Sequence, residues 1–119
     1  MTNKTLILPW PPKGLSPNDR IHWAKKAKIT KAYRNISRVL AMQAGLVAPT
    51  TERILLALEF VPPDRRARDD DNLIASCKGL RDGIADALGI DDKRFVTQFS
   101  LSGDVAKGGM VLVRLGEAG

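Results

Sequence analysis

One apolar run most constrains how this chain can fold. Residues 53–61 read Arg-Ile-Leu-Leu-Ala-Leu-Glu-Phe-Val, and Pro62-Pro63 follows at once. Such a run, short and bounded by residues that cannot continue a hydrogen-bonded ladder, is typical of a strand in the middle of a sheet. We therefore expect a buried central strand, with the other elements arranged around it.

Two helices are expected, one on each side of this strand in the sequence. The first is indicated by three- and four-residue steps between apolar residues from Ile29 to Leu40. Asn18 or Asp19 could cap it, and Gly45 would end it, although the stretch around Trp23 could instead be an arm or a loop. The second is expected over residues 71–88, closed by Gly89.

Three shorter strands complete the expected fold. Residues 4–8 form an apolar segment that ends at a proline-rich turn, and residues 95–102 and 110–115 alternate between apolar and polar. The two alternating segments are joined by a glycine-rich connection, which is typical of a hairpin. The predicted order is β-α-β-α-β-β, an α+β fold in which two helices cover a small mixed sheet.

Length and composition limit the chain to a few classes. Its 119 residues suit one domain over residues 1–119, and 44% apolar residues suffice for a packed core. No run approaches the roughly 20 apolar residues of a membrane span, and no signal peptide is evident. The single Cys77 excludes an internal disulfide, and one Cys with one His cannot form a Cys/His zinc site. We expect a soluble, cytoplasmic protein.

The charges are unevenly distributed along the chain. The formal net charge is +6, which favours anionic partners, yet eight of the thirteen acidic residues lie between Asp64 and Asp92. The basic residues are densest in two groups, which are Arg20, Lys25, Lys26, Lys28, Lys31, Arg34 and Arg38, and then Arg65, Arg66 and Arg68. Each group could be a solvated face or could contact phosphates. With only six aromatic residues, a platform that stacks single strands is not favoured.

Two acidic clusters flank the second expected helix. Asp69-Asp70-Asp71 stands at its start, where one carboxylate can cap the helix, and Asp91-Asp92 follows its end, where it could be an ordinary turn. If the clusters meet, mutual repulsion requires a cation, and Mg²⁺ prefers such oxygen ligands. An ion held there would activate water for phosphodiester cleavage. The residues alone do not establish that the clusters meet.

On one continuous helix, Asp71, Lys78 and Asp82 would share a face opposite the apolar side. Lys78 could then pair with Asp82 one turn away or contact a phosphate, and the two readings are equally supported. Cys77 lies on the apolar side and is interpreted as a core residue. His22 has no evident partner and is not assigned a catalytic role.

The chain resembles the RusA-type Holliday junction resolvases, small endodeoxyribonucleases of bacteria and their prophages. The resemblance runs in ordered pieces over nearly the whole chain, which are Leu8-Pro9-Trp10-Pro11-Pro12, Pro17-Asn18 with Arg20, Pro63-Asp64-Arg65-Arg66, Arg68-Asp69-x-Asp71-Asn72-Leu73, Asp86-Ala87-Leu88-Gly89, Asp91-Asp92 and Lys107-Gly108-Gly109.

The resemblance implies a homodimer that binds four-way DNA and cuts two strands symmetrically with Mg²⁺, for which Mn²⁺ could substitute. It assigns the metal and catalytic role to Asp69, Asp71 and Asp92, with Asp91 in support, and it implies that the two acidic clusters converge. Shorter members have a lysine where this chain has Ala75, so Lys78 is the residue expected to supply that charge. The expected DNA contacts are Arg65, Arg66, Arg68, Lys25, Lys26 and Lys28.

Two alternatives come from other classes of protein. A non-catalytic, basic DNA-binding protein would use the aspartates only as helix caps. A metal-dependent phosphoesterase would act on RNA or on another phosphate ester.

Overall fold

The computed structural model describes residues 5–15, 20–68 and 70–118. Its elements follow in the order β1 (Leu6–Pro9), α1 (Trp23–Gln43), β2 (Ile54–Val61), α2 (Asp70–Ser76), α3 (Lys78–Leu88), the 3-10 turn η1 (Asp92–Arg94), β3 (Phe95–Leu101) and β4 (Met110–Glu117). The expected α+β fold with a small mixed sheet is confirmed.

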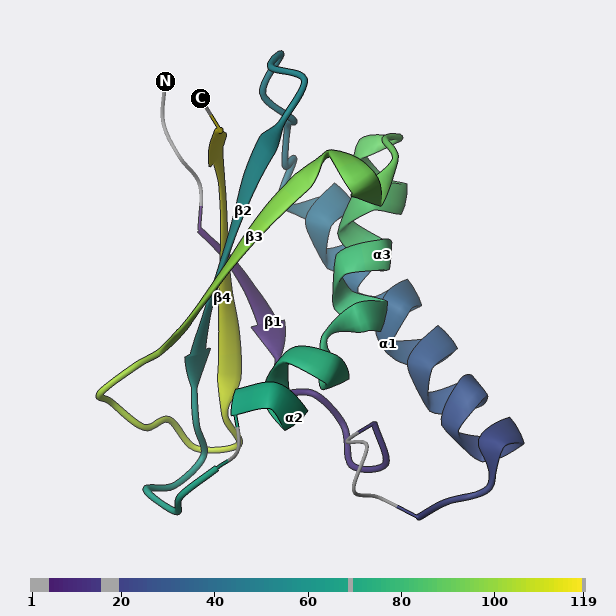
Figure 1. Cartoon of the computed structure of the whole chain (residues 1–119), viewed down its shortest axis with the longest axis vertical. Coiled ribbons are helices and arrows are strands. Elements are labelled where there is room, and N and C mark those ends of the chain that lie inside the picture. The colour runs from purple at the N-terminus through teal and green to yellow at the C-terminus, as the bar shows by residue number, and fades with distance from the viewer. Residues whose placement is uncertain (1–4, 16–19, 69, 119) are drawn as a thin grey trace.

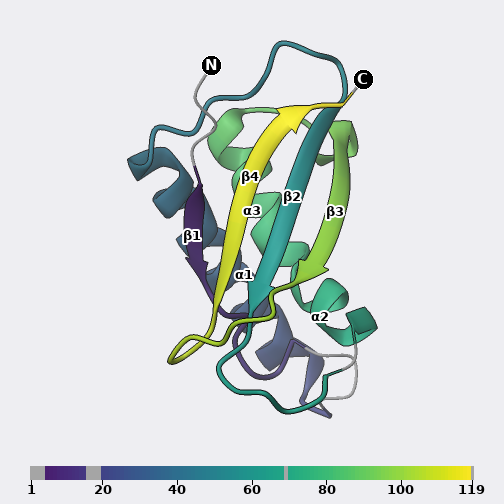
Figure 2. The same cartoon turned by 90° about the vertical axis from the view of Figure 1, so that its left-hand side faces the viewer.

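The four strands form one sheet in the order β1-β4-β2-β3. β4 runs antiparallel to both of its neighbours, whereas β2 and β3 are parallel. The helices lie on one face of this sheet, with α1 and α3 side by side across it (Figures 1 and 2). Because only that face is covered, burial along β2 alternates between buried and half-buried residues over most of its length.

The core lies between the sheet and the two long helices. Its large apolar side chains with at most 2% of their surface exposed include Tyr33, Leu8, Ile54, Leu56, Leu58, Leu80, Ile84, Val111 and Val113. Cys77 belongs to this core, as expected, and its burial raises the pKa of its thiol to about 12. A thiol with that pKa remains protonated and unreactive near neutral pH.

Two glycines allow α1 and α3 to approach closely. A Cβ atom on Gly83 would lie 2.2 Å from the carbonyl oxygen of Arg34, and one on Gly79 would lie 2.9 Å from that of Thr30. No ordinary side chain fits these spaces, so the glycines fix how α3 lies on α1.

The first helix begins later than expected. Asn18 and Asp19 lie outside the described residues, and α1 starts at Trp23, so the prediction of a cap at residue 18 or 19 was wrong. His22 is the cap, because its Nδ1 accepts a hydrogen bond from the backbone nitrogen of Ala24 at 3.1 Å. His22, which had no evident partner in the sequence, therefore pairs with the backbone of the helix that it caps.

The second expected helix is two helices. The chain breaks at Cys77, which has non-helical backbone angles, so α2 and α3 do not share one axis. α2 instead lies against the ends of β2 and β3, where Leu73 and Ile74 border a small pocket with Phe60 and Phe99. The expected common face of Asp71, Lys78 and Asp82 is therefore absent, because it required an unbroken helix.

The expected hairpin between the last two strands was also wrong. β4 pairs with β1 and β2, and β3 pairs with β2 on the other side. The glycine-rich connection crosses the end of β2, where the backbone nitrogens of Ser102 and Ala106 donate to the carbonyl oxygens of Phe60 and Pro62. Alternating strands joined by glycines resemble a hairpin whether or not a third strand lies between them.

Candidate nucleic-acid interface

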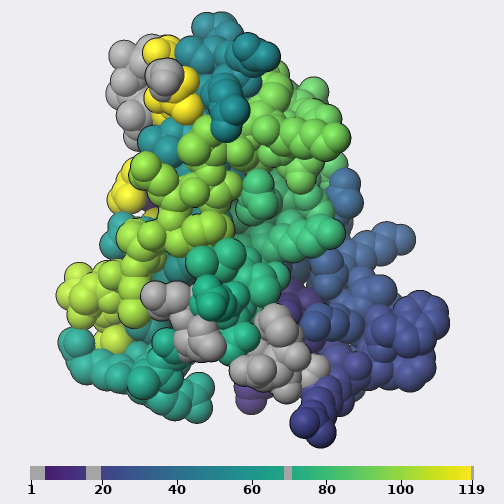
Figure 3. Space-filling view, viewed as in Figure 1, coloured from purple at the N-terminus to yellow at the C-terminus, as the bar shows by residue number. Residues whose placement is uncertain are grey.

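Three segments meet at the end of the molecule where β2 finishes. They are the proline-rich segment after β1, the basic loop 64–68 after β2, and the neighbouring start of α2, with the first turns of α1 projecting beside them (Figures 1 and 3). We call this end the basic end. A cleft of about 540 Å³ opens there, lined among others by Trp10, Lys13, Arg66, Arg68 and Asn72.

Arg68 builds this loop from within. Its side chain is only 11% exposed and pairs with the carboxylate of Asp64 at 2.8 Å. It also donates to the carbonyl oxygens of Asp64 and Arg66, at 3.0 Å and 2.9 Å, and its guanidinium lies 5.5 Å from the centre of the Trp10 ring. With so many internal contacts, Arg68 shapes the wall of the cleft.

The carboxylate of Asp64 completes the loop. It accepts a hydrogen bond from the backbone nitrogen of Arg66 at 2.9 Å, and this bond, followed by that from Arg68, lowers the pKa of Asp64. Asp64 is therefore ionised near neutral pH and holds the turn of the loop together.

The other two arginines of the loop differ in what they can contact. Arg65 donates to the carbonyl oxygen of Gly103 at 3.1 Å, which ties the loop to the β3–β4 connection. The side chain of Arg66 is 77% exposed and borders the cleft. Arg65 is exposed as well, and the Nε of Arg66 lies 4.0 Å from the carboxylate of Asp64, so Arg66 is the largely exposed arginine of the loop that borders the cleft.

The lysines expected to contact DNA lie on the first turns of α1. Lys25 and Lys28 are exposed and Lys26 is half-buried. All three stand at the basic end, on a helix without a single acidic residue over its 21 positions.

The acidic start of α2 adjoins the cleft. Asp71 is exposed on the first turn of α2, and its neighbour Asn72 lines the cleft. Asp69 lies outside the described residues. Carboxylates at a helix start are stabilised by the backbone nitrogens there, so their position satisfies the capping explanation as well as a functional one.

Asp91 and Asp92 lie at the other end of the sheet. Ile54 and Phe95 pair at the starts of the parallel strands β2 and β3, so η1 lies beside the beginning of β2, whereas α2 follows its end. At about 3.3 Å per residue, β2 spans roughly 23 Å. Within one chain, Asp92 is therefore not brought to Asp71. Among residues 5–15, 20–68 and 70–118, no three His, Cys, Asp or Glu side chains are grouped as metal ligands.

The second acidic pair has other partners. Asp91 caps η1 by accepting a hydrogen bond from the backbone nitrogen of Lys93 at 2.9 Å, which lowers its pKa. Asp92 influences the ionisation of Asp82. Burial is the largest cause of the raised pKa of Asp82, the charge of Arg34 opposes it, and the charge of Asp92 adds to it.

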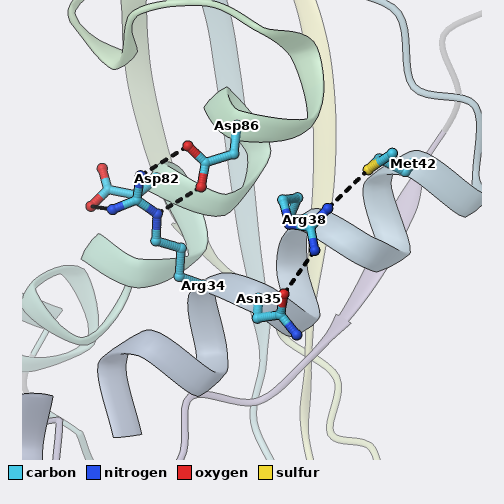
Figure 4. Close-up of polar contacts among 6 residues, drawn as sticks. All are labelled: Arg34, Asn35, Arg38, Met42, Asp82 and Asp86. Atoms are coloured by element: carbon cyan, nitrogen blue, oxygen red, sulfur yellow. Dashed lines mark hydrogen bonds and ion pairs between the residues drawn. The ribbon is translucent and has the colours of Figure 1, made fainter. Parts of the chain in front are cut away.

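Arg34 is the centre of this second cluster. Its guanidinium donates to both oxygens of Asp86, at 2.7 Å and 2.9 Å, and lies 3.9 Å from Asp82 (Figure 4). The hydrogen bonds with Asp86, followed by the charges of Asp86 and Asp82, raise the pKa of Arg34, and the hydrogen bond from Arg34 lowers the pKa of Asp86. We call Arg34, Asp82 and Asp86 the α1–α3 ion cluster. A helix-period pattern marks these residues only as polar, so the sequence did not reveal it.

Lys78 begins α3, the helix that carries Asp82 and Asp86. It is exposed at the first position of α3, and its charge lowers the pKa of Asp82 one turn later. The charge of Lys78 therefore acts on Asp82, as one of its two expected roles requires.

Sequence comparison places the chain in a family. No family model matches it. A protein of Xylella fastidiosa (strain Temecula1), described as uncharacterized, is 45% identical over 115 residues that span 94% of this chain and 75% of the relative. This chain belongs to that protein's family. The description of the relative names no activity or substrate, so function rests on the site itself.

The helices were also compared with the requirements of a membrane span. None in the described part of the chain has both the length and the apolar character needed to cross a bilayer.

Proposed function

We propose that this protein is a metal-dependent endonuclease that acts on branched DNA, as its resemblance to the RusA-type resolvases suggests. The observation that supports this most is the acidic start of α2 beside a basic cleft. Arg66 and Lys13 can attract a phosphate backbone to the place where the carboxylates of α2 begin.

The metal requirement is part of the proposal, with Mg²⁺ as the expected ion and Mn²⁺ as a substitute. The described carboxylates of one chain do not form the expected set, because Asp91 and Asp92 are a strand's length away from Asp71. Asp71 and its neighbour Asp69 are the residues proposed to hold the ion from this chain.

A homodimer offers a way to complete the set. β3 is an edge strand, with one side unpaired in the sheet. Leu101 at its end is 51% exposed, and Ile74 of the neighbouring α2 is 37% exposed. Two copies related by a two-fold axis would pair their β3 strands antiparallel. That arrangement turns η1 of one copy toward α2 of the other, and so brings Asp92 of the second copy to the side of Asp71.

A non-catalytic DNA-binding protein is the second candidate. The separation of Asp71 from Asp92 within one chain favours it, since aspartates that never share an ion can be helix caps alone. It predicts salt-dependent binding without cleavage.

The proposal is tested by incubating the protein with a synthetic four-way junction, the matching linear duplex and a structured RNA, each with Mg²⁺ and with EDTA. Mg²⁺-dependent cutting of the junction in preference to the duplex is expected. Junction binding without any cutting would support the second candidate, and preferential cutting of RNA would indicate a phosphoesterase of another class.

A further inference from the structure

Trp23 is the largest apolar side chain left in solvent, and the fold gives it no core role. It is 76% exposed at the first position of α1. Its ring contact is with His22, at 5.4 Å between ring centres. A tryptophan this exposed commonly marks a surface that meets a partner.

The position of Trp23 follows from how α1 extends past α3. Trp23 lies seven residues before Thr30 and eleven before Arg34, so all three share one face of the helix. That face packs on α3 at Gly79 and Gly83. Seven residues correspond to about 10 Å, so Trp23 stands two turns beyond the last close contact with α3. Figure 1 shows the start of α1, which Trp23 begins, projecting beyond the sheet.

The indole is held on a rigid base. His22 caps the helix through its Nδ1, and the backbone nitrogen of Lys26 donates to the carbonyl oxygen of His22 at 3.0 Å. These bonds fix the backbone from which the indole projects, so binding requires little further ordering of the backbone at this position.

The surroundings of Trp23 are positively charged. Lys25, Lys28 and Lys31 are exposed, and within the described ranges no carboxylate lies at ion-pair distance from any of them. A flat aromatic ring among cations suits a polyanion that also offers a flat ring.

A nucleobase meets this description better than a lipid does. A helix that binds a bilayer needs a continuous apolar face, and the apolar face of α1 is turned to the core through Tyr33 and Ala41. Trp23 alone projects from the exposed first turns as a large apolar side chain. Few aromatic residues exclude a platform for many bases, but one ring suffices for one base.

We propose that Trp23 stacks on a single unpaired or unstacked base at the branch point of DNA, while the lysines of α1 contact the adjacent phosphates. This inference rests on the proposed function, since it assumes a DNA substrate. It makes Trp23 a residue that selects branched over continuous duplex, because a duplex keeps its bases stacked on one another.

The test measures binding to a four-way junction and to the matching duplex in EDTA, by gel shift and by tryptophan fluorescence. The variants are Trp23→Ala, Trp23→Phe and, as a control, Ile36→Ala, which removes another exposed apolar side chain of α1. Trp23→Ala is expected to weaken junction binding about tenfold and duplex binding little, with Trp23→Phe in between. Wild-type fluorescence should be quenched by the junction, and the quenching should be smaller in Trp23→Phe, in which only Trp10 remains to report binding at the cleft.

Failure of the inference can be told from failure of the proposed function. If the wild type binds DNA and Trp23→Ala binds the junction as tightly as the wild type does, the inference is wrong and DNA binding stands. If the wild type binds no DNA at any salt concentration, the proposed function fails as well. A blue shift of Trp23 fluorescence on anionic vesicles, without quenching by DNA, would assign this surface to lipid.

Discussion

Single residues at the basic end divide into those that build the site and those that face a ligand. The side chain of Arg68 contacts Asp64 and Trp10 and is 11% exposed, whereas the side chain of Arg66 is 77% exposed at the cleft. The sequence predicted all three arginines as DNA contacts, because a run of like charges does not show which side chain folds back. The exposure of Trp23 was not predicted either. It depends on where α3 begins to cover α1, which the sequence pattern does not show.

Arg66→Ala is expected to weaken DNA binding without lowering stability. Removing one phosphate contact should reduce the slope of log affinity against log salt by about 0.9. The measurement is the salt dependence of junction binding, together with thermal unfolding. Arg114→Ala is the matched control, because Arg114 pairs with Glu59 on the sheet. An unchanged slope for Arg66→Ala would remove it from the interface.

Asp86→Asn is expected to lower stability at neutral pH only. The hydrogen bond from Arg34 lowers the pKa of Asp86 in the folded state, so its contribution is present above the ordinary Asp pKa of about 3.9 and is lost as pH falls through the lowered value. We expect a decrease in Tm of about 2–4 °C at pH 7, as for other exposed ion pairs. Urea unfolding of both proteins from pH 7 down to pH 3 should show the difference shrinking with acidity. A difference that grows toward pH 3 would be incompatible with this pairing.

Elements were predicted best where burial alone decides them. β2 was located to within one residue, because an apolar run between polar and proline boundaries has few alternatives. The break at Cys77 was missed, because helix periodicity continues through it and does not show where the backbone angles leave the helix. The pairing of β4 with β1 and β2 was missed because alternation does not specify a neighbour.

Gly83→Ala is expected to destabilise the fold by about 1–3 kcal/mol, because a Cβ there would meet the backbone of α1. Chemical denaturation measures the change. Gly103→Ala serves as the control, since nothing lies within 4 Å of a Cβ at that position. Equal stability of the two variants would mean that α1 and α3 do not pack as described.

At the scale of the whole molecule, the parallel pairing of β2 and β3 separates the acidic clusters. The residues alone did not establish that Asp71 and Asp92 approach, and the resemblance implied that they do, but the register places them at opposite ends of β2 within one chain. No local pattern encodes this, because it depends on the direction in which β3 joins the sheet. A second copy is the proposed remedy.

Mixed dimers test that remedy. Asp71→Asn and Asp92→Asn should each be inactive alone, yet a dimer with one chain of each would contain one site with both native carboxylates. Co-expression with two different affinity tags allows the mixed dimer to be purified. We expect it to nick one strand of a junction at about half the wild-type rate per dimer. Absence of any cutting by the mixed dimer would place both aspartates in a site formed by one chain, or in none.

The most direct test of the account is the cutting of a four-way junction in Mg²⁺ by wild type, Asp71→Asn and Asp104→Asn, with binding measured in parallel. Asp104 is an exposed carboxylate on the β3–β4 connection and serves as the control. We predict that Asp71→Asn loses cutting by about 100-fold or more while it binds the junction at least as tightly, and that Asp104→Asn cuts normally. Cutting by Asp71→Asn at the wild-type rate would contradict a catalytic role for the acidic start of α2.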